Sequence, residues 1–165
     1  MSIPTELTIR LESEISEGMG KLSKRELGNL KERLADSLYS SGQFDASINS
    51  LKEAVTIYEI YNDSKALARL SNKIACTCFA QNSYAEALEY FGEQHRHGQE
   101  SKKVVTASRG LTNKSIVELL TGNYEDAVKS IDSAIQILNE GSDDEVSTFA
   151  LVRRRSPPFL PLSMT

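Results

Sequence analysis

The stretch "GQFDASINSLKEAV", residues 42–55, decides the fold because two similar stretches follow it in the chain. "NSYAEALEYFGEQH" occupies residues 82–95, and "GNYEDAVKSIDSAI" occupies residues 122–135. An aromatic side chain recurs every 40 residues, as Phe44, Tyr84 and Tyr124. Similarity at a fixed period of this length is typical of proteins built from stacked structural repeats. The sequence therefore predicts three related units.

The secondary structure of these units is predicted to be helical. Proline, which costs about 3 kcal/mol inside a helix, is absent from residues 5–156. Apolar residues recur at spacings of three and four, as on one face of an amphipathic helix. Ser23 and Glu26 form the sequence pattern of a capping box, and Gly42 fits a helix C-terminus. We therefore expect an all-α fold.

These signals divide the chain into a flanking helix, three helix pairs and a C-terminal segment. We expect the N-terminal flanking helix within residues 1–22, running from about residue 4 to residue 18. The three helix pairs are expected within 23–140, at about 23–61, 63–98 and 101–139. A short end helix is expected within 141–153, followed by an extended basic, proline-containing tail at 154–165.

Aligning the chain with itself at the 40-residue period gives columns of matched size. Small residues fill two columns: Ser47, Ala87 and Ala127, and Ala35, Ala75 and Ser115. Large apolar residues fill another: Leu51, Phe91 and Ile131. Small residues let two helices of a pair approach, large ones fill the space between pairs, and stacking buries the face that each pair leaves bare. The alternative is a closed helical bundle whose 40-residue spacing is accidental.

The matched segments 34–54, 74–94 and 114–134 resemble the tetratricopeptide repeat. That motif combines a large–small pair, a glycine, aromatic residues and two alanines. Three positions depart from it: Asn82 stands for the glycine, Gln94 for the second alanine and Lys114 for a large apolar residue. The resemblance implies a right-handed α-solenoid of stacked antiparallel helix pairs, and a function in protein–protein interaction.

The period is longer than the usual unit of about 34 residues in this family. It is similar to the long repeats of the Partner-of-Inscuteable-type G-protein modulators and of the tonsoku-type genome-maintenance scaffolds. The residues do not choose between these two groups.

Candidate binding residues come from the first helix of each pair, which lines the concave face in a stack of this kind. Arginine offers a planar donor fork for carboxylates, and asparagine can bind a peptide backbone. On an acidic body a local basic stripe is informative, and the resemblance implies an extended acidic peptide as the ligand. Glu32 and Asp36 would give the groove an acidic end in the first unit. The candidate partner-binding residues are Asn29, Arg33, Asp36, Arg69, Asn72, Lys73, Arg109 and Asn113. The alternative is an ordinary solvated helix face.

Charge and composition exclude several other classes of function. The chain carries 19 basic and 23 acidic residues, and three of the basic ones are the arginines at 153–155. An acidic body argues against direct nucleic-acid binding, which needs a basic surface. No apolar run approaches the roughly 20 residues of a membrane span, and the N-terminus has no secretory signal pattern. Two cysteines form no disulfide framework, so we expect an intracellular protein of the cytoplasm or nucleus.

Metal binding and catalysis find no support in the sequence. Cys76 and Cys78, like His95 and His97, are two residues apart, so on a helix their side chains point about 200° apart and cannot chelate together. A zinc site would need side chains that converge from different helices. We expect Cys78 in the core and both histidines at the surface. The common catalytic motifs are also absent, so no enzyme activity and no cofactor are expected.

Two functional hypotheses follow. The first is an adaptor or scaffold that binds an extended or helical segment of another protein in the concave groove. The second is a structural subunit that self-associates or caps a larger assembly through exposed helix ends, including Phe149, Leu151 and Val152. The tail is an inert extension, a linear motif with a kinase site at Ser156, or a segment that folds back on the repeats.

Overall fold

The computed structural model describes residues 5–18 and 20–141, and in this part of the chain it contains seven α-helices and no strand. They are α1 (Glu6–Gly18), α2 (Lys24–Ser40), α3 (Phe44–Ile60), α4 (Ser64–Ala80), α5 (Tyr84–Glu100), α6 (Val104–Leu120) and α7 (Tyr124–Glu140). The all-α prediction is confirmed. The predicted end helix and tail lie outside the described residues, apart from Gly141.

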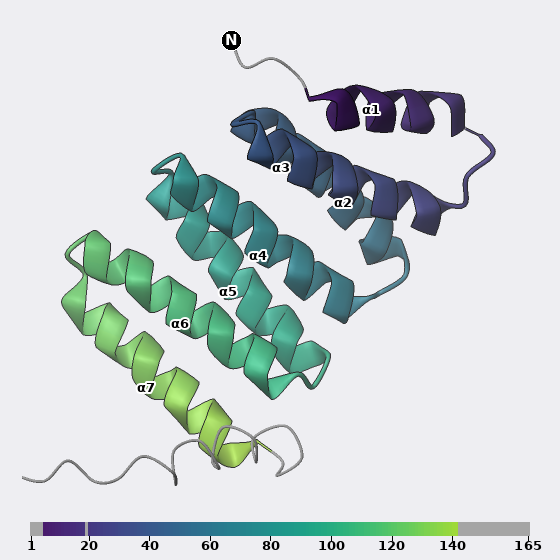
Figure 1. Cartoon of the computed structure of the whole chain (residues 1–165). Helices are drawn as coiled ribbons and strands as arrows, with labels where there is room; N and C mark the ends of the chain where they lie inside the picture. Colours follow the sequence, from purple (N-terminus) through teal and green to yellow (C-terminus); the bar gives the residue numbers. More distant parts are fainter. Residues whose placement is uncertain (1–4, 19, 142–165) are drawn as a thin grey trace, which may run out of the picture.

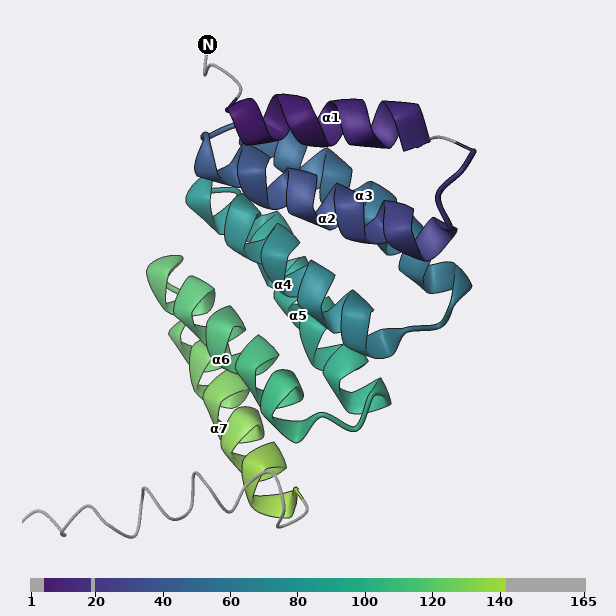
Figure 2. The same cartoon turned by 45° about the vertical axis from the view of Figure 1, so that its right-hand side comes forward.

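The helices pack in series as an all-α solenoid (Figure 1). From α2 onward every helix has 17 residues, and a three-residue turn reverses the chain before the next helix. This gives the antiparallel pairs α2/α3, α4/α5 and α6/α7, with α1 packed against α2. In both views α2, α4 and α6 lie next to one another on one side, and α3, α5 and α7 lie behind them (Figure 2). We call the first surface the α2/α4/α6 face.

The turns are built alike, and their chemistry explains where the helices end. The middle residue of each turn from α2 to α7 has a positive φ: Gly42, Asn62, Asn82, Lys102 and Gly122. The following N–H then reaches the carbonyl five residues back, as in the 2.8 Å bond from Lys103 to Gly98. Glycine and asparagine adopt this conformation readily, whereas lysine does so rarely.

Two predicted helix boundaries were wrong. The second pair was expected to end near residue 98 and the third to begin near 101, but α5 continues to Glu100 and α6 begins at Val104. The turn at Lys102 has neither glycine nor asparagine, so the sequence gives no signal there. The first helix begins at Glu6, directly after Thr5, which is the first described residue.

The predicted capping box is confirmed, and α4 begins with a further side-chain cap. Ser23 and Glu26 form the capping box at the start of α2, and the Asp63 side chain accepts a 3.0 Å hydrogen bond from the N–H of Ala66 in α4. A cap of this kind typically contributes about 1 kcal/mol. Local side-chain hydrogen bonds therefore help to set where α2 and α4, the first helices of the first two pairs, begin.

The repeat columns form the core. The small residues of both columns are buried, as expected for positions where two helices of a pair meet. Phe91 is 4% exposed within the central cluster, which confirms its predicted burial between pairs. Phe44 and Tyr84 each stack on an aromatic of the preceding helix, but Tyr124 is 66% exposed. The equivalent partner of Tyr124 is Leu119, which is itself half-exposed.

Candidate functional site

The candidate residues lie on the three helices that form the α2/α4/α6 face. Asn29, Arg33 and Asp36 are on α2; Arg69, Asn72 and Lys73 are on α4; Arg109 and Asn113 are on α6. The structure joins these helices differently at their two junctions. We describe the α2–α4 junction first and the α4–α6 junction second.

At the α2–α4 junction, acidic residues of α2 pair with basic residues of α4. The Arg69 guanidinium donates two hydrogen bonds to the Glu32 carboxylate, both of 2.8 Å. The Lys73 ammonium lies 3.0 Å from Glu32 and 2.7 Å from Asp36. The acidic end expected in the first unit therefore neutralises the cations of the second unit.

The protonation of Glu32 reflects this pairing. The residue is 8% exposed, and burial by itself raises the pKa of its carboxyl group. The hydrogen bonds from Arg69 and Lys73 outweigh burial, so the pKa of Glu32 lies below its usual value. The same bond, acting against desolvation, raises the pKa of Arg69. Both groups are charged at neutral pH.

At the α4–α6 junction the same register places an amide where the first junction has a carboxylate. Glu32 corresponds to Asn72 at the 40-residue period, and Arg69 corresponds to Arg109. Asn72 accepts a 3.3 Å hydrogen bond from Asn113, the counterpart of Lys73. Within the described part of the chain, no carboxylate pairs with the exposed Arg109 side chain.

A hollow of about 250 Å³ lies between α4 and α6 at this point. Its polar lining includes Lys65, Arg69, Asn72, Gln94, Lys103 and Arg109. Four of these side chains are cationic, and none of the described residues that line the hollow is acidic. We call it the α4–α6 hollow.

Gln94 comes from α5 and is 2% exposed, yet its side-chain oxygen has no hydrogen-bond partner. A buried acceptor without a donor costs about 1–3 kcal/mol, so such groups are normally satisfied by protein, water or ligand. The hollow therefore combines cations with an unsatisfied acceptor.

The remaining candidates lie elsewhere on the face. Asn29 accepts a hydrogen bond from the Tyr58 hydroxyl of α3, which turns its amide toward the second layer. Arg33 and Asp36 border a shallow depression between α1 and α2. Asp36, Lys73 and Asn72 also line a second hollow of about 270 Å³ where α2, α3 and α4 meet.

Sequence reasoning missed three residues of the α4–α6 hollow: Lys65, Lys103 and Gln94. The two lysines belong to no conspicuous column. Gln94, however, stands in the alanine column, between Ala54 and Ala134, which are both buried. A long polar side chain in a column of small core residues was the available signal.

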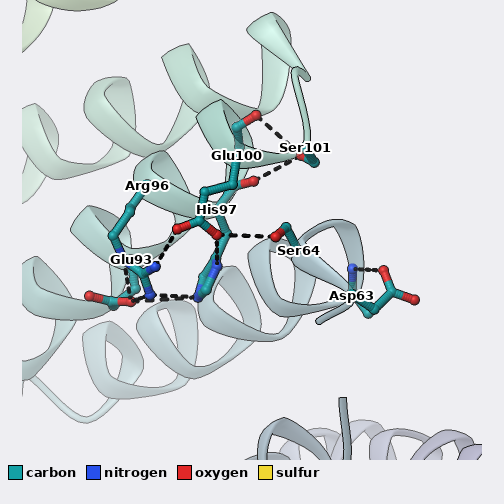
Figure 3. Close-up of polar contacts among 9 residues, drawn as sticks. Asp63, Ser64, Glu93, Arg96, His97, Glu100 and Ser101 are labelled. Carbon is teal, nitrogen blue, oxygen red and sulfur yellow. Dashed lines mark hydrogen bonds and ion pairs between the residues drawn. The ribbon is translucent and has the colours of Figure 1, made fainter. Parts of the chain in front are cut away.

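The prediction that both histidines lie at the surface was wrong for His97, which is 9% exposed. Its ring nitrogens lie 2.9 Å from Glu100 and 3.5 Å from Glu93, and Arg96 bridges the same two carboxylates (Figure 3). Ser64 of α4 donates a 3.1 Å bond to Glu100. The end of α5 is thus fixed to the start of α4, and α6 also packs against α5.

The two cysteines differ in their exposure. Cys76 is exposed and Cys78 is buried, which confirms the predicted core position of Cys78. Burial, reinforced by Glu86, raises the pKa of the Cys78 thiol to about 11. Within the described ranges no group of three or more His, Cys, Asp or Glu side chains is placed to hold a metal ion. No helix of the same ranges has the length and hydrophobicity needed to cross a membrane.

Comparison with known proteins gives the same architecture. Residues 26–93 match the tetratricopeptide repeat family. No curated protein matches the chain. Aspartyl phosphate phosphatase F from Bacillus subtilis superposes with a TM-score of 0.66 at 20% identity, over 79% of this chain and 34% of that one.

BtubC (BKLC) from P. vanneervenii superposes with a TM-score of 0.70 at 13% identity, over 96% of this chain and 61% of that one. The chain therefore spans only about a third and three-fifths of the lengths of these two proteins. At such identities the likeness shows the fold alone: tetratricopeptide-like helical repeats stacked in series.

Proposed function

We propose that this protein is an adaptor or scaffold that holds an acidic segment of a partner protein against the α2/α4/α6 face. The observation that carries the proposal is the cationic α4–α6 hollow on an otherwise acidic body. Arg109 has no internal counter-charge among the described residues. An acidic partner would supply it, and complementary charge favours both encounter and register.

The family match supports the same proposal, because tetratricopeptide repeats generally mediate protein–protein interaction. The long period resembles the repeats of scaffolds of the Partner-of-Inscuteable and tonsoku types, and we propose a scaffolding role of that general kind. The proposal includes no catalysis, no cofactor, and no direct nucleic-acid or membrane partner. It places the protein inside the cell, in the cytoplasm or the nucleus.

The ion pair between Arg69 and Glu32 decides which arginine should be mutated to test this proposal. Reversing both Arg69 and Arg109 to Glu would place a second acid against the buried Glu32 and would destabilise the first junction. Arg109→Glu alone changes the face without breaking an internal ion pair. Arg10→Glu, on α1, is the matched control, because Arg10 is exposed and lies outside the hollow.

The experiment is affinity capture and mass spectrometric identification of a partner, followed by titration of that purified partner. We expect Arg109→Glu to weaken binding at least tenfold, and Arg10→Glu to leave it within about twofold, with both variants folded. Added salt should also weaken the wild-type complex. Equal affinity of wild type and Arg109→Glu would move the binding surface away from this face.

A second candidate function rests on the other end of the solenoid. Tyr124, Val128 and Ile135 of α7 are 66%, 60% and 45% exposed. Their equivalents in α3 and α5 lie where the next helix pair packs, so this stripe of α7 is suited to self-association or to capping a larger assembly. Sedimentation at tens of micromolar distinguishes the two: a monomer contradicts self-association.

A further inference from the structure

We propose that the α4–α6 hollow is a subsite for one acidic residue of the bound segment, which it recognises by two groups at once. The side-chain carboxylate pairs with Arg109, and a main-chain N–H of the segment donates to Gln94. This inference rests on the proposed function and adds to it the place and the chemistry of recognition.

The repeat register is the first argument. The chain itself shows what belongs opposite this arginine column, because Arg69 donates from Nε and Nη2 to the two oxygens of the Glu32 carboxylate. One unit later, the position of Glu32 is held by Asn72, which bonds instead to Asn113. Among the described residues no carboxylate faces Arg109, and Arg109 lines the α4–α6 hollow. A ligand carboxylate restores the pairing of the first junction.

The charge of the lining is the second argument. Lys65, Arg69 and Arg109 gather around one hollow, and among the described residues no acidic side chain lines it. Glu32 offsets only Arg69 of these, from the far side of the α2–α4 junction. Like charges brought together in a partly desolvated space repel one another, so a single anion in the hollow lowers the electrostatic energy of the group.

The buried acceptor is the third argument, and it specifies a peptide over a free anion. The unpartnered oxygen of Gln94 needs a donor, whereas a carboxylate or an inorganic anion offers only acceptors. A peptide residue carries both: an acidic side chain and a backbone N–H a few ångströms away. The hollow therefore matches an Asp or Glu residue within a chain.

The probe for this proposal is a random dodecapeptide library displayed on phage and selected on the whole chain. We expect selected peptides to share an Asp or Glu at one position. A fluorescein-labelled consensus peptide is then titrated by anisotropy against wild type and variants. Arg109→Glu and Asn72→Glu should each weaken it at least tenfold, the latter because it supplies the missing carboxylate from within. Arg10→Glu, outside the hollow, is the control and should stay within about twofold.

The Gln94 contact is tested from both sides. Gln94→Leu should weaken the consensus peptide severalfold, and N-methylation of the peptide at the residue that donates to Gln94 should reproduce that loss on wild-type protein. The methylated peptide keeps the test valid if Gln94→Leu folds poorly. A scan of single N-methyl positions identifies the donor, and a scan in which no position matters overturns this contact.

Each remaining outcome is decisive. An acidic consensus that binds Arg109→Glu and Asn72→Glu as well as wild type overturns the subsite while leaving the proposed function standing. Selection without acidic preference, or without any binder, counts against both. Succinate that binds as tightly as the peptide would make the hollow a small-anion site and overturn peptide recognition there.

Discussion

The two junctions of the solenoid follow one register but are built from different side chains. Where α3 packs on α4, the buried positions include Tyr58 of α3 and Leu70 of α4. Where α5 meets α6, the same positions hold Gly98 and Gly110. A Cβ on Gly110 would lie 2.7 Å from the backbone nitrogen of His95, so the backbones of α5 and α6 are in direct contact.

On the α2/α4/α6 face the first junction is the closely joined one, and the second is open. The first junction is closed by the ion pairs of Glu32 with Arg69 and Lys73. The second has Asn72 in place of the acid, and a cationic hollow in front of Arg109. A repeat can therefore turn a self-neutralised junction into an open cationic hollow by changing one acidic position.

The largest effect is expected in the core that both junctions share. Phe91→Ala should lower the free energy of unfolding by about 3–5 kcal/mol, because it empties a large site between pairs. Ile131→Ala, at the same column of the last described pair, should cost less since Ile131 is only partly buried. Urea melts of the two variants test this, and a loss below about 1 kcal/mol for Phe91→Ala would show that the register is wrong.

The glycine contact of the second junction comes next. Gly110→Ala should destabilise the fold by about 1–3 kcal/mol, because the new methyl group meets backbone atoms of α5 that cannot move independently. Gly92→Ala is the matched control, since nothing lies within 4 Å of its added Cβ. That control should stabilise the helix by up to about 1 kcal/mol. If Gly110→Ala were equally stabilising, the close approach of α5 and α6 would be refuted.

The ion pairs of the first junction should appear in the pH dependence of stability. Because the pKa of Glu32 is lowered in the folded state, its contribution is present above its unfolded pKa of about 4.5 and is lost as the pH falls through its folded pKa. Glu32→Gln should lower stability by about 1 kcal/mol at pH 7, and this difference should shrink toward pH 3. Urea melts at each pH measure it, with Glu125→Gln as an exposed control; a difference that stays constant with pH would contradict the assignment.

Much of the fold could be predicted because it depends on local chemistry and on period. The capping box at Ser23, the cap at Asp63 and the small and large columns are all visible in the sequence. The boundary at Lys102 was not visible, because the turn there adopts a positive φ without the usual residue.

The candidate site could be predicted only by column. The register placed Arg69 and Arg109 in one column, but it did not show that Glu32 already binds Arg69. That pairing depends on how far one pair is rotated against the next, which the sequence does not encode locally. Gln94 and His97 show the same limit, because burial on α5 comes from neighbours on both sides.

The central claim is that the second junction lacks the carboxylate that closes the first, and two double-mutant cycles on folding stability test it most directly. The cycle of Glu32→Gln with Arg69→Ala should give a coupling of up to about 1 kcal/mol. The cycle of Asn72→Gln with Arg109→Ala should give a coupling near zero. In the Asn72→Glu background, Arg109→Ala should reveal a coupling similar to the first. Strong coupling between Asn72 and Arg109 in the natural sequence, or none after Asn72→Glu, would contradict this account of the α4–α6 hollow.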